Sequence, residues 1–274
     1  MPMIKTRDGV DLYVKDWGSG RPVILIHGWP LNADSWEDQA LALAQAGHRV
    51  IAYDRRGFGR SGQPWTGYDY DTLSDDLAQV IEATGAHDAA IFGFSMGGGE
   101  VARYMSRHGG RNVRSAGLIA SVVPYMLKDA TNPDGTPPEM IEEQMKAPIR
   151  ADRASFFIQF AKYFYGAGYI TSPVSEGVLH SFERMAAQGS IKAVLDCIDA
   201  FMTTDFRPDL PSFTVPTLIV HGTADQTVPI DLSARAAARG IGQAILLEYE
   251  GEPHGLKVTS KDRLSADMLA FLDR

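Results

Sequence analysis

The stretch "AAIFGFSMGGGEVARY", residues Ala89–Tyr104, sets a single serine between an apolar run and a run of glycines. The residues before Ser95 are typical of a buried strand, and the residues after it have the apolar spacing of a helix. Gly93, Ser95 and Gly97 fit the pattern G-x-S-x-G, which marks a nucleophile elbow when a strand precedes it and a helix follows it. We therefore predict that Ser95 occupies a strained turn that lifts its hydroxyl out of the edge of a sheet.

The glycines around Ser95 are explained by the crowding of such a turn. A side chain at Gly93 or Gly97 would collide with the neighbouring strand and helix. Gly98 and Gly99 would let the following helix pack close to the sheet. The alternative is a glycine-rich turn that contains a serine by chance. The flanking strand and helix, together with suitable catalytic partners elsewhere in the sequence, favour the elbow.

Strands and helices alternate on both sides of this stretch. Continuous apolar runs such as "PVILIHG" (22–28) and "HRVIAYD" (48–54) predict strands buried on both faces. Segments such as "YDTLSDDLAQVIEATG" (70–85) predict amphipathic helices that stop at glycine, and "VDLYVKDWG" (10–18) alternates like a half-exposed antiparallel strand. The fold class is therefore α/β, with a mostly parallel sheet built from right-handed crossovers and helices on both faces.

The alternation stops at Pro124 and resumes after Pro211. Residues 124–211 contain helical, aromatic-rich segments and no clear strand, so we predict a helical cap insertion there. It would lie over the carboxyl ends of the strands, where open α/β sheets bind ligands, with residues 1–123 and 212–274 forming the core. Its aromatic cluster is too dense for one helix face and must divide between core and pocket: Phe156, Phe157, Phe160, Tyr163 and Phe164.

A nucleophilic serine needs a base, and the base needs an acid that orients it. In this fold the expected chain order is serine, acid, histidine. Asp225 follows a late strand in the loop "TADQTVP", and His254 follows the last strand in the loop "EPHGL". Both loops open at the same edge of the sheet as Ser95. We therefore predict a catalytic triad of Ser95, Asp225 and His254.

The other candidate bases and acids fit this order less well. Four histidines fall at the opposite edge of the sheet or at helical and surface positions: His48, His87, His108 and His180. His221 ends a strand but precedes the aspartate, so we expect it to be structural. Among the acids, Asp129 lies several residues too far beyond its strand, and Glu252 is expected to point to solvent.

Acyl transfer through a tetrahedral oxyanion requires backbone N–H donors. We expect one donor to be the amide of Met96, which follows the nucleophile at a helix N-terminus, where the helix dipole also helps. The second donor should come from the loop "HGWPLNADSW" (27–36), with the amide of Trp29 as the candidate. Pro30 has no amide hydrogen and cannot serve. The indole of Trp29 can form an aromatic wall of the pocket at the same time.

Composition and charge exclude several classes of protein. The chain has 274 residues, of which 45% are hydrophobic, enough for one α/β domain with an insertion. Its 34 acidic and 26 basic side chains give a formal net charge of -8, which disfavours nucleic acid and anionic membranes as partners. A single cysteine, Cys197, excludes an internal disulfide and a multi-cysteine metal site, and we expect it to be a buried small side chain. No segment is typical of a signal peptide or a membrane span, so we expect a cytoplasmic protein.

The chain resembles the cofactor-free haloperoxidase and aryl esterase branch of the α/β-hydrolases. The segments that carry the resemblance are, in order, "HGWPLNADSW", "YDRRGFGRSGQPW", "GFSMGGGEVARY", "HGTADQTVP" and "PHG". The resemblance covers nearly the whole chain and is weakest across residues 125–200, the part expected to set substrate choice. It implies an α/β-hydrolase fold with an eight-stranded sheet.

The same resemblance implies a function. It assigns Ser95, Asp225 and His254 to the triad and the amides of Trp29 and Met96 to the oxyanion. It implies esterase activity on small carboxylic esters and perhydrolysis of carboxylic acids by hydrogen peroxide, without a metal or other cofactor. The peracid can then oxidise halide. Relatives of this kind tend to assemble, so a homo-oligomer is expected.

Other functions on this fold stay open. Some relatives hydrolyse lactams, so a lactamase is one alternative, and a non-catalytic binder of small molecules is another. Dehalogenases and epoxide hydrolases need a carboxylate at the elbow, and Ser95 argues against both. A phosphate-cradling role for "DRRGFGRS" (54–61) lacks the lysine and helix of a P-loop. We expect Arg55 and Arg56 to tie backbone carbonyls and acids together instead.

Overall fold

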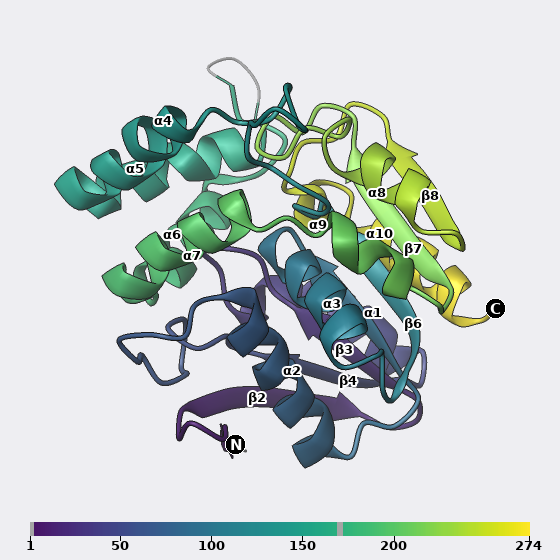
Figure 1. The fold of residues 1–274 in the computed structure, drawn as a ribbon. Helices are drawn as coiled ribbons and strands as arrows, with labels where there is room; N and C mark the ends of the chain where they lie inside the picture. The colour runs from purple at the N-terminus through teal and green to yellow at the C-terminus, as the bar shows by residue number, and fades with distance from the viewer. Residues whose placement is uncertain (1–2, 169–171) are drawn as a thin grey trace.

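The computed structural model describes residues 3–168 and 172–274, and in these residues the strands form an eight-stranded sheet (Figure 1). The strands run across it in the order β1-β2-β4-β3-β5-β6-β7-β8. Their bounds are β1 Met3–Lys5, β2 Asp11–Gly18, β3 Pro22–Ile26, β4 Arg49–Tyr53, β5 Ala89–Phe94, β6 Val113–Ile119, β7 Thr217–Gly222 and β8 Ala244–Tyr249. β2 pairs antiparallel with β1 and β4, and the remaining pairs are parallel. The predicted fold class and strand number are confirmed.

The helices around the sheet form two packed groups. Their bounds are α1 Glu37–Gln45, α2 Tyr70–Thr84, α3 Met96–Arg107, α8 Ala234–Gly240, α9 Leu256–Thr259 and α10 Lys261–Leu272, with a 3-10 turn η1 at Ala33–Trp36. In Figure 1, α2 and α3 pack together in front of the sheet, whereas α1 packs against α10 behind it. Asp69 caps α2 by accepting from the N–H of Thr72, and Gly85 ends it in the left-handed region at φ 61°.

The segment between β6 and β7 is helical, as its sequence predicts. It contains α4 Pro138–Ile141, the π-helical turn η2 Glu142–Lys146, α5 Ala147–Phe164, α6 Glu176–Ala187, α7 Ile191–Thr203 and the 3-10 turn η3 Arg207–Ser212. No strand occurs in the described part of this segment. Figure 1 places α4 to α7 beyond the ends of β3 and β4, on one side of the sheet. The exact limits of a cap at residues 124 and 211 stay a prediction.

The topology brings distant segments to one edge. β5 is fully buried and lies between β3 and β6, with Gly93 opposite Ile26 and Phe94 opposite Ile119. β7, which is also fully buried, continues the parallel set to β8. Because these strands are parallel, the loops that follow them open at the same edge of the sheet.

No described helix is long and apolar enough to cross a bilayer.

Candidate active site

Ser95 sits in a strained turn between β5 and α3. Its backbone has φ 52° and ψ −119°, a conformation that residues with a side chain rarely adopt. A Cβ added at Gly93 would lie 2.2 Å from the carbonyl oxygen of Gly97, and one added at Gly97 would lie 2.6 Å from that of Ile26. These are backbone atoms that cannot swing aside. The predicted strain and the predicted collisions with helix and strand are therefore confirmed.

The substitution Gly93→Ala should destabilise the protein by about 1–3 kcal/mol, the usual cost of overpacking a close-packed site. The new methyl group must push apart β5 and the start of α3. Urea unfolding measures the effect. Gly242→Ala is the matched control, because Gly242 is exposed and a Cβ added there meets nothing within 4 Å. Equal stability of the two variants would contradict the steric account of the elbow.

The three predicted triad residues form one hydrogen-bonded chain. His254 Nε2 lies 2.9 Å from Ser95 Oγ, and His254 Nδ1 lies 2.6 Å from Asp225 Oδ2. The three residues are 6%, 1% and 5% exposed in the order Ser95, His254, Asp225, so the relay is shielded from bulk water. With Nδ1–H donating to the carboxylate, Nε2 is free to accept the serine proton.

The carboxylate of Asp225 is held from every side. Its Oδ1 accepts from the N–H of Thr227 at 2.9 Å and of Val228 at 2.8 Å, so only Oδ2 is left to face His254. Burial alone would raise the pKa of Asp225. The charge of His254 and the hydrogen bonds from His221 and His254 outweigh burial, and the pKa lies well below its usual range. Asp225 is therefore ionised at neutral pH.

His221 contacts the acid, which the sequence reasoning did not foresee. Its Nε2 lies 3.1 Å from Asp225 Oδ2 and 2.8 Å from the carbonyl oxygen of Val228. It is fully buried and does not reach Ser95 in any described hydrogen bond. His221 thus supports the orientation of Asp225 from outside the triad. The sequence does contain an indication of this contact. His221 lies only four residues before Asp225, a separation that a turn can close.

The remaining candidates lie away from the relay. His108 Nε2 is 2.8 Å from Asp75 on α2, and His180 is exposed beside Glu183 on α6. Cys197 is buried in α7, and burial raises the pKa of its thiol to about 12. It is therefore no nucleophile at neutral pH.

Two amides near Ser95 are available as oxyanion donors. Met96 is the first residue of α3, so its N–H has no acceptor within the helix. No backbone acceptor in the described part of the chain takes the N–H of Trp29. The Trp29 loop lies directly against the nucleophile, since a Cβ added at Gly28 would be 2.9 Å from the Cβ of Ser95. Both residues therefore lie in segments that adjoin Ser95, which keeps their amides as candidate oxyanion donors.

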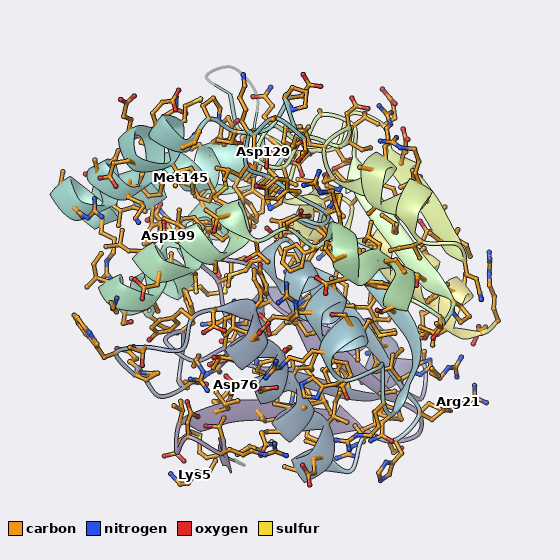
Figure 2. The ribbon with its side chains drawn as sticks, viewed as in Figure 1. Lys5, Arg21, Asp76, Asp129, Met145 and Asp199 are labelled. Atoms are coloured by element: carbon orange, nitrogen blue, oxygen red, sulfur yellow. The ribbon has the colours of Figure 1, made fainter. Side chains whose placement is uncertain are left out.

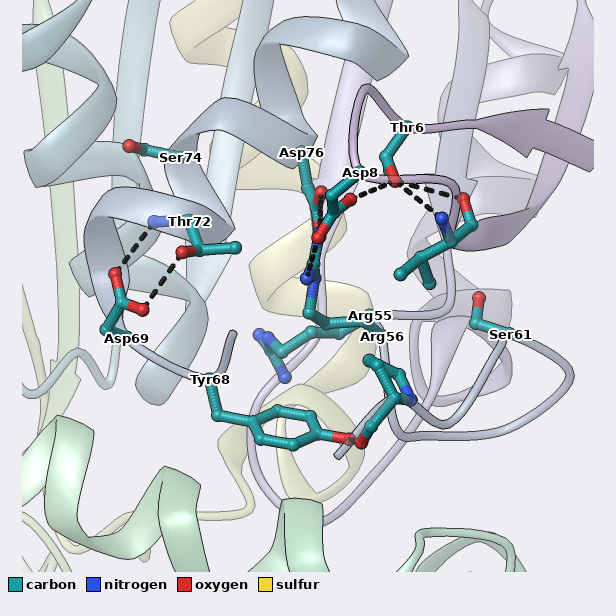
Figure 3. Close-up of polar contacts among 12 residues, drawn as sticks. Thr6, Asp8, Arg55, Arg56, Ser61, Tyr68, Asp69, Thr72, Ser74 and Asp76 are labelled. Carbon is teal, nitrogen blue, oxygen red and sulfur yellow. Dashed lines mark hydrogen bonds and ion pairs between the residues drawn. The ribbon is translucent and has the colours of Figure 1, made fainter. Parts of the chain in front are cut away.

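Two buried arginines make ion pairs near this loop, and one of them, Arg55, contacts the loop itself. Arg55 pairs with Glu100 and donates from Nη2 to the carbonyl oxygen of His27 at 2.5 Å, while its own N–H donates to His27 Nε2 at 2.9 Å. Arg56 lies 2.6 Å from Asp76 and 2.8 Å from Asp8. Figure 3 shows these three residues side by side. Both guanidinium groups are occupied by acids and carbonyls. The interpretation of "DRRGFGRS" as a structural loop therefore agrees with the contacts.

A cavity of about 390 Å³ opens above Ser95 and His254. It divides the aromatic cluster: Phe156, Phe160 and Tyr163 line the cavity, whereas Phe157 and Phe164 are buried. The ring of Trp29 forms another wall, and its Nε1 donates to the carbonyl oxygen of Val194 at 3.0 Å. The other apolar lining residues are Val122, Met126, Met140, Ile141, Met145, Phe201, Met202 and Val228, and the polar ones are Thr136, Gln144, Gln226 and Thr227.

Comparison with known proteins finds relatives along the full length. The family described as "alpha/beta hydrolase fold" matches residues 21–259. The chain is 44% identical over 276 residues to a non-heme chloroperoxidase from Kitasatospora aureofaciens, with 100% of both chains covered. It is 42% identical over 275 residues to a bifunctional esterase/perhydrolase from Acinetobacter calcoaceticus, with 99% of both covered. The solved bromoperoxidase from Bacillus anthracis superposes with a TM-score of 0.95 at 43% identity, covering 100% of this chain and 99% of that one.

Proposed function

The chain belongs to the α/β-hydrolase family, and from that premise we propose that it is a serine hydrolase of small carboxylic esters that can also pass the acyl group to hydrogen peroxide. The observation that carries the proposal is the hydrogen-bonded chain from Ser95 through His254 to Asp225 at the floor of an apolar cavity. The name of the relative from Acinetobacter calcoaceticus, a bifunctional esterase/perhydrolase, gives the same two reactions.

The first half of the reaction forms an acyl-enzyme. Ser95 Oγ attacks the ester carbonyl carbon while His254 Nε2 takes the hydroxyl proton, and Asp225 stabilises the imidazolium that results. The N–H groups of Trp29 and Met96 donate to the oxyanion, and each such donor contributes about 10²–10³-fold to turnover. When the tetrahedral intermediate collapses, His254 gives its proton to the leaving alkoxide.

The second half releases the acyl group. Water or hydrogen peroxide enters, and His254 Nε2 removes its proton as the oxygen attacks the acyl carbon. The second intermediate expels Ser95 Oγ, which recovers the proton from His254. Water gives a carboxylic acid, and hydrogen peroxide gives a peracid. No metal or other cofactor is needed in either branch, because the acyl-enzyme itself supplies the activated carbonyl.

The cavity supports a neutral substrate. Its described lining includes no Lys, Arg, Asp or Glu, and His254 is its single ionisable catalytic group. A charged group remote from the carbonyl that Ser95 attacks would lose hydration there without gaining a charged partner. The aromatic and methionine side chains instead favour short aliphatic or aryl acyl groups.

A substrate panel tests the function. We expect the wild-type protein to hydrolyse p-nitrophenyl acetate and p-nitrophenyl butyrate, and to form peracid from acetate and hydrogen peroxide, detected by bromide-dependent halogenation of a dye. Turnover of an N-acyl lactam in preference to the esters would favour the lactamase. Binding of esters, seen by fluorescence quenching, without any turnover would favour a non-catalytic binder and contradict the proposal.

We also propose that the protein works in the cytoplasm as a homo-oligomer. The single cysteine supports the first point, because proteins of the reducing cytosol do not depend on disulfides. The second is supported by the resemblance to a branch whose members assemble. Light scattering of the purified chain measures its mass in solution, and a monomer would contradict the second point.

A further inference from the structure

Four methionines line the same cavity as the nucleophile: Met126, Met140, Met145 and Met202. They come from separate segments, since Met126 follows β6, Met140 and Met145 belong to α4 and η2, and Met202 belongs to α7. Figure 2 shows Met145 on the helical segment that covers the sheet edge. Their thioethers therefore surround the space in which an acyl group would leave Ser95.

A thioether is a soft nucleophile that peracids oxidise. The sulfur lone pair attacks the terminal peroxy oxygen, the O–O bond breaks, and an S–O bond forms. The peroxy proton ends on the carboxylate oxygen. Sulfur is oxidised by two electrons to a sulfoxide, and the peracid is reduced to its carboxylic acid. No further reactant is needed beyond the peracid that perhydrolysis makes.

We propose that Met126 and Met202, with Met140 and Met145 at the same cavity, are oxidised to sulfoxides by the peracid before it leaves the pocket. The inference rests on the proposed perhydrolysis. It identifies a modification site within the substrate cavity. It also implies that the substrate specificity changes as the enzyme turns over. A sulfoxide is polar, so each one replaces an apolar part of the wall and weakens binding of longer acyl chains.

Because Met126 and Met202 are buried, they react selectively with peracid that forms inside the cavity. Met126 is 2% exposed and Met202 is 5% exposed, so bulk oxidant reaches them through the cavity. Met3 on β1 is 48% exposed and reports oxidant in solution. Met105 and Met268 are buried and do not line the cavity, so they report loss of folding. The chain thus carries its own internal controls.

Peptide mass spectrometry of the full chain tests the proposal. Wild type and Ser95→Ala are incubated with butyrate, hydrogen peroxide and excess N-acetylmethionine, without halide. The scavenger captures peracid that has been released. We expect sulfoxide at Met126 and Met202 to be about tenfold higher in wild type than in Ser95→Ala, because a peracid formed in the cavity acts at millimolar effective concentration. Met3 should be oxidised equally in both proteins.

The outcomes separate this inference from the proposed function. If wild type oxidises the scavenger more than Ser95→Ala does, but Met126 and Met202 are no more oxidised than in that variant, the inference is wrong and perhydrolysis stands. If the scavenger is not oxidised above the Ser95→Ala level, perhydrolysis itself is wrong and the inference falls with it.

A second readout follows specificity. After exposure to butyrate and peroxide, we expect KM for p-nitrophenyl butyrate to rise several-fold more than KM for p-nitrophenyl acetate. Methionine sulfoxide reductase should reverse the change. A variant with leucine at all four positions keeps similar volumes, so its own KM ratio should not drift during the same exposure. Equal drift in both proteins would overturn the inference.

Discussion

Ser95→Ala is expected to lower kcat for ester hydrolysis by about 10⁶-fold. Ser95 Oγ lies 2.9 Å from His254 Nε2, and alanine removes the oxygen that would form the acyl bond. The residual rate would come from the oxyanion amides and from binding in the cavity. Turnover of p-nitrophenyl acetate at high enzyme concentration measures the difference.

Stability should not account for that loss. Alanine at φ 52° bears much the same backbone strain as serine, so Tm should stay close to that of the wild type. Ser121→Ala is the matched control at the same edge of the sheet: its buried Oγ accepts from the N–H of Val123 at 3.2 Å. That change should cost about 1 kcal/mol of stability and keep kcat nearly unchanged. Ser95→Ala activity within about tenfold of wild type would reveal a different nucleophile.

The elbow could be predicted from sequence because its causes are local. The close approach of Gly93 to the Gly97 carbonyl is set by residues four apart in the chain, and the flanking strand and helix have strong periodicity. The hydrogen bonds that join Ser95, His254 and Asp225 could be predicted because parallel strands bring the loops that follow them to one edge. Chain order then selects among the acids and histidines.

Features decided by three-dimensional packing could not be predicted in this way. The sequence indicates that the aromatic cluster divides, but it does not say that Phe160 faces the cavity while Phe164 packs against His254, with ring centroids 4.9 Å apart. The same limit explains His221, whose approach to Asp225 depends on how the turn after β7 folds back.

The periodicity of apolar residues also failed to predict the short elements. β1 has three residues and so shows too little alternation to be recognised. The segment "PIDLSARAAARG" (229–240) has the composition of one continuous helix. The helix begins only at Ala234, because the carbonyl groups of Pro229 and Ile230 accept turn hydrogen bonds from Leu232 and Ser233. The four-residue α9 after the His254 loop was likewise not anticipated. None of these differences moves a candidate catalytic residue.

Asp225→Asn is the second large effect, an expected loss of about 10⁴-fold in kcat with the fold intact. Oδ1 of Asp225 accepts two backbone N–H groups, from Thr227 and Val228. In the variant the amide oxygen takes this position, since an NH2 group there would face two backbone donors. At the Oδ2 position the NH2 group faces one donor, His221 Nε2, which keeps the Val228 carbonyl oxygen as its acceptor. The NH2 group is therefore directed at His254 Nδ1.

The tautomer of His254 then becomes the wrong one. An NH2 donor opposite Nδ1 requires that nitrogen to accept, so the ring proton moves to Nε2. Nε2–H cannot take the proton of Ser95, and the nucleophile loses its base. Asp129→Asn is the control, since Asp129 is the rival acid from the sequence and accepts from the Tyr125 hydroxyl at 3.0 Å outside the relay. Its kcat should stay within about twofold of wild type.

The pH dependence of stability gives an independent check on the same carboxylate. The pKa of Asp225 in the folded protein lies below the value of about 3.9 in an unfolded chain, so ionised Asp225 stabilises the fold above that pH. This contribution is lost as the pH falls toward the folded-state pKa. The difference in unfolding free energy between wild type and Asp225→Asn, measured by urea titration, should therefore narrow as the pH falls below about 4. The proposal would be contradicted if this difference in unfolding free energy stayed constant and the variant kept nearly full activity. Asp225 would then neither be ionised beside His254 nor determine the tautomer of His254.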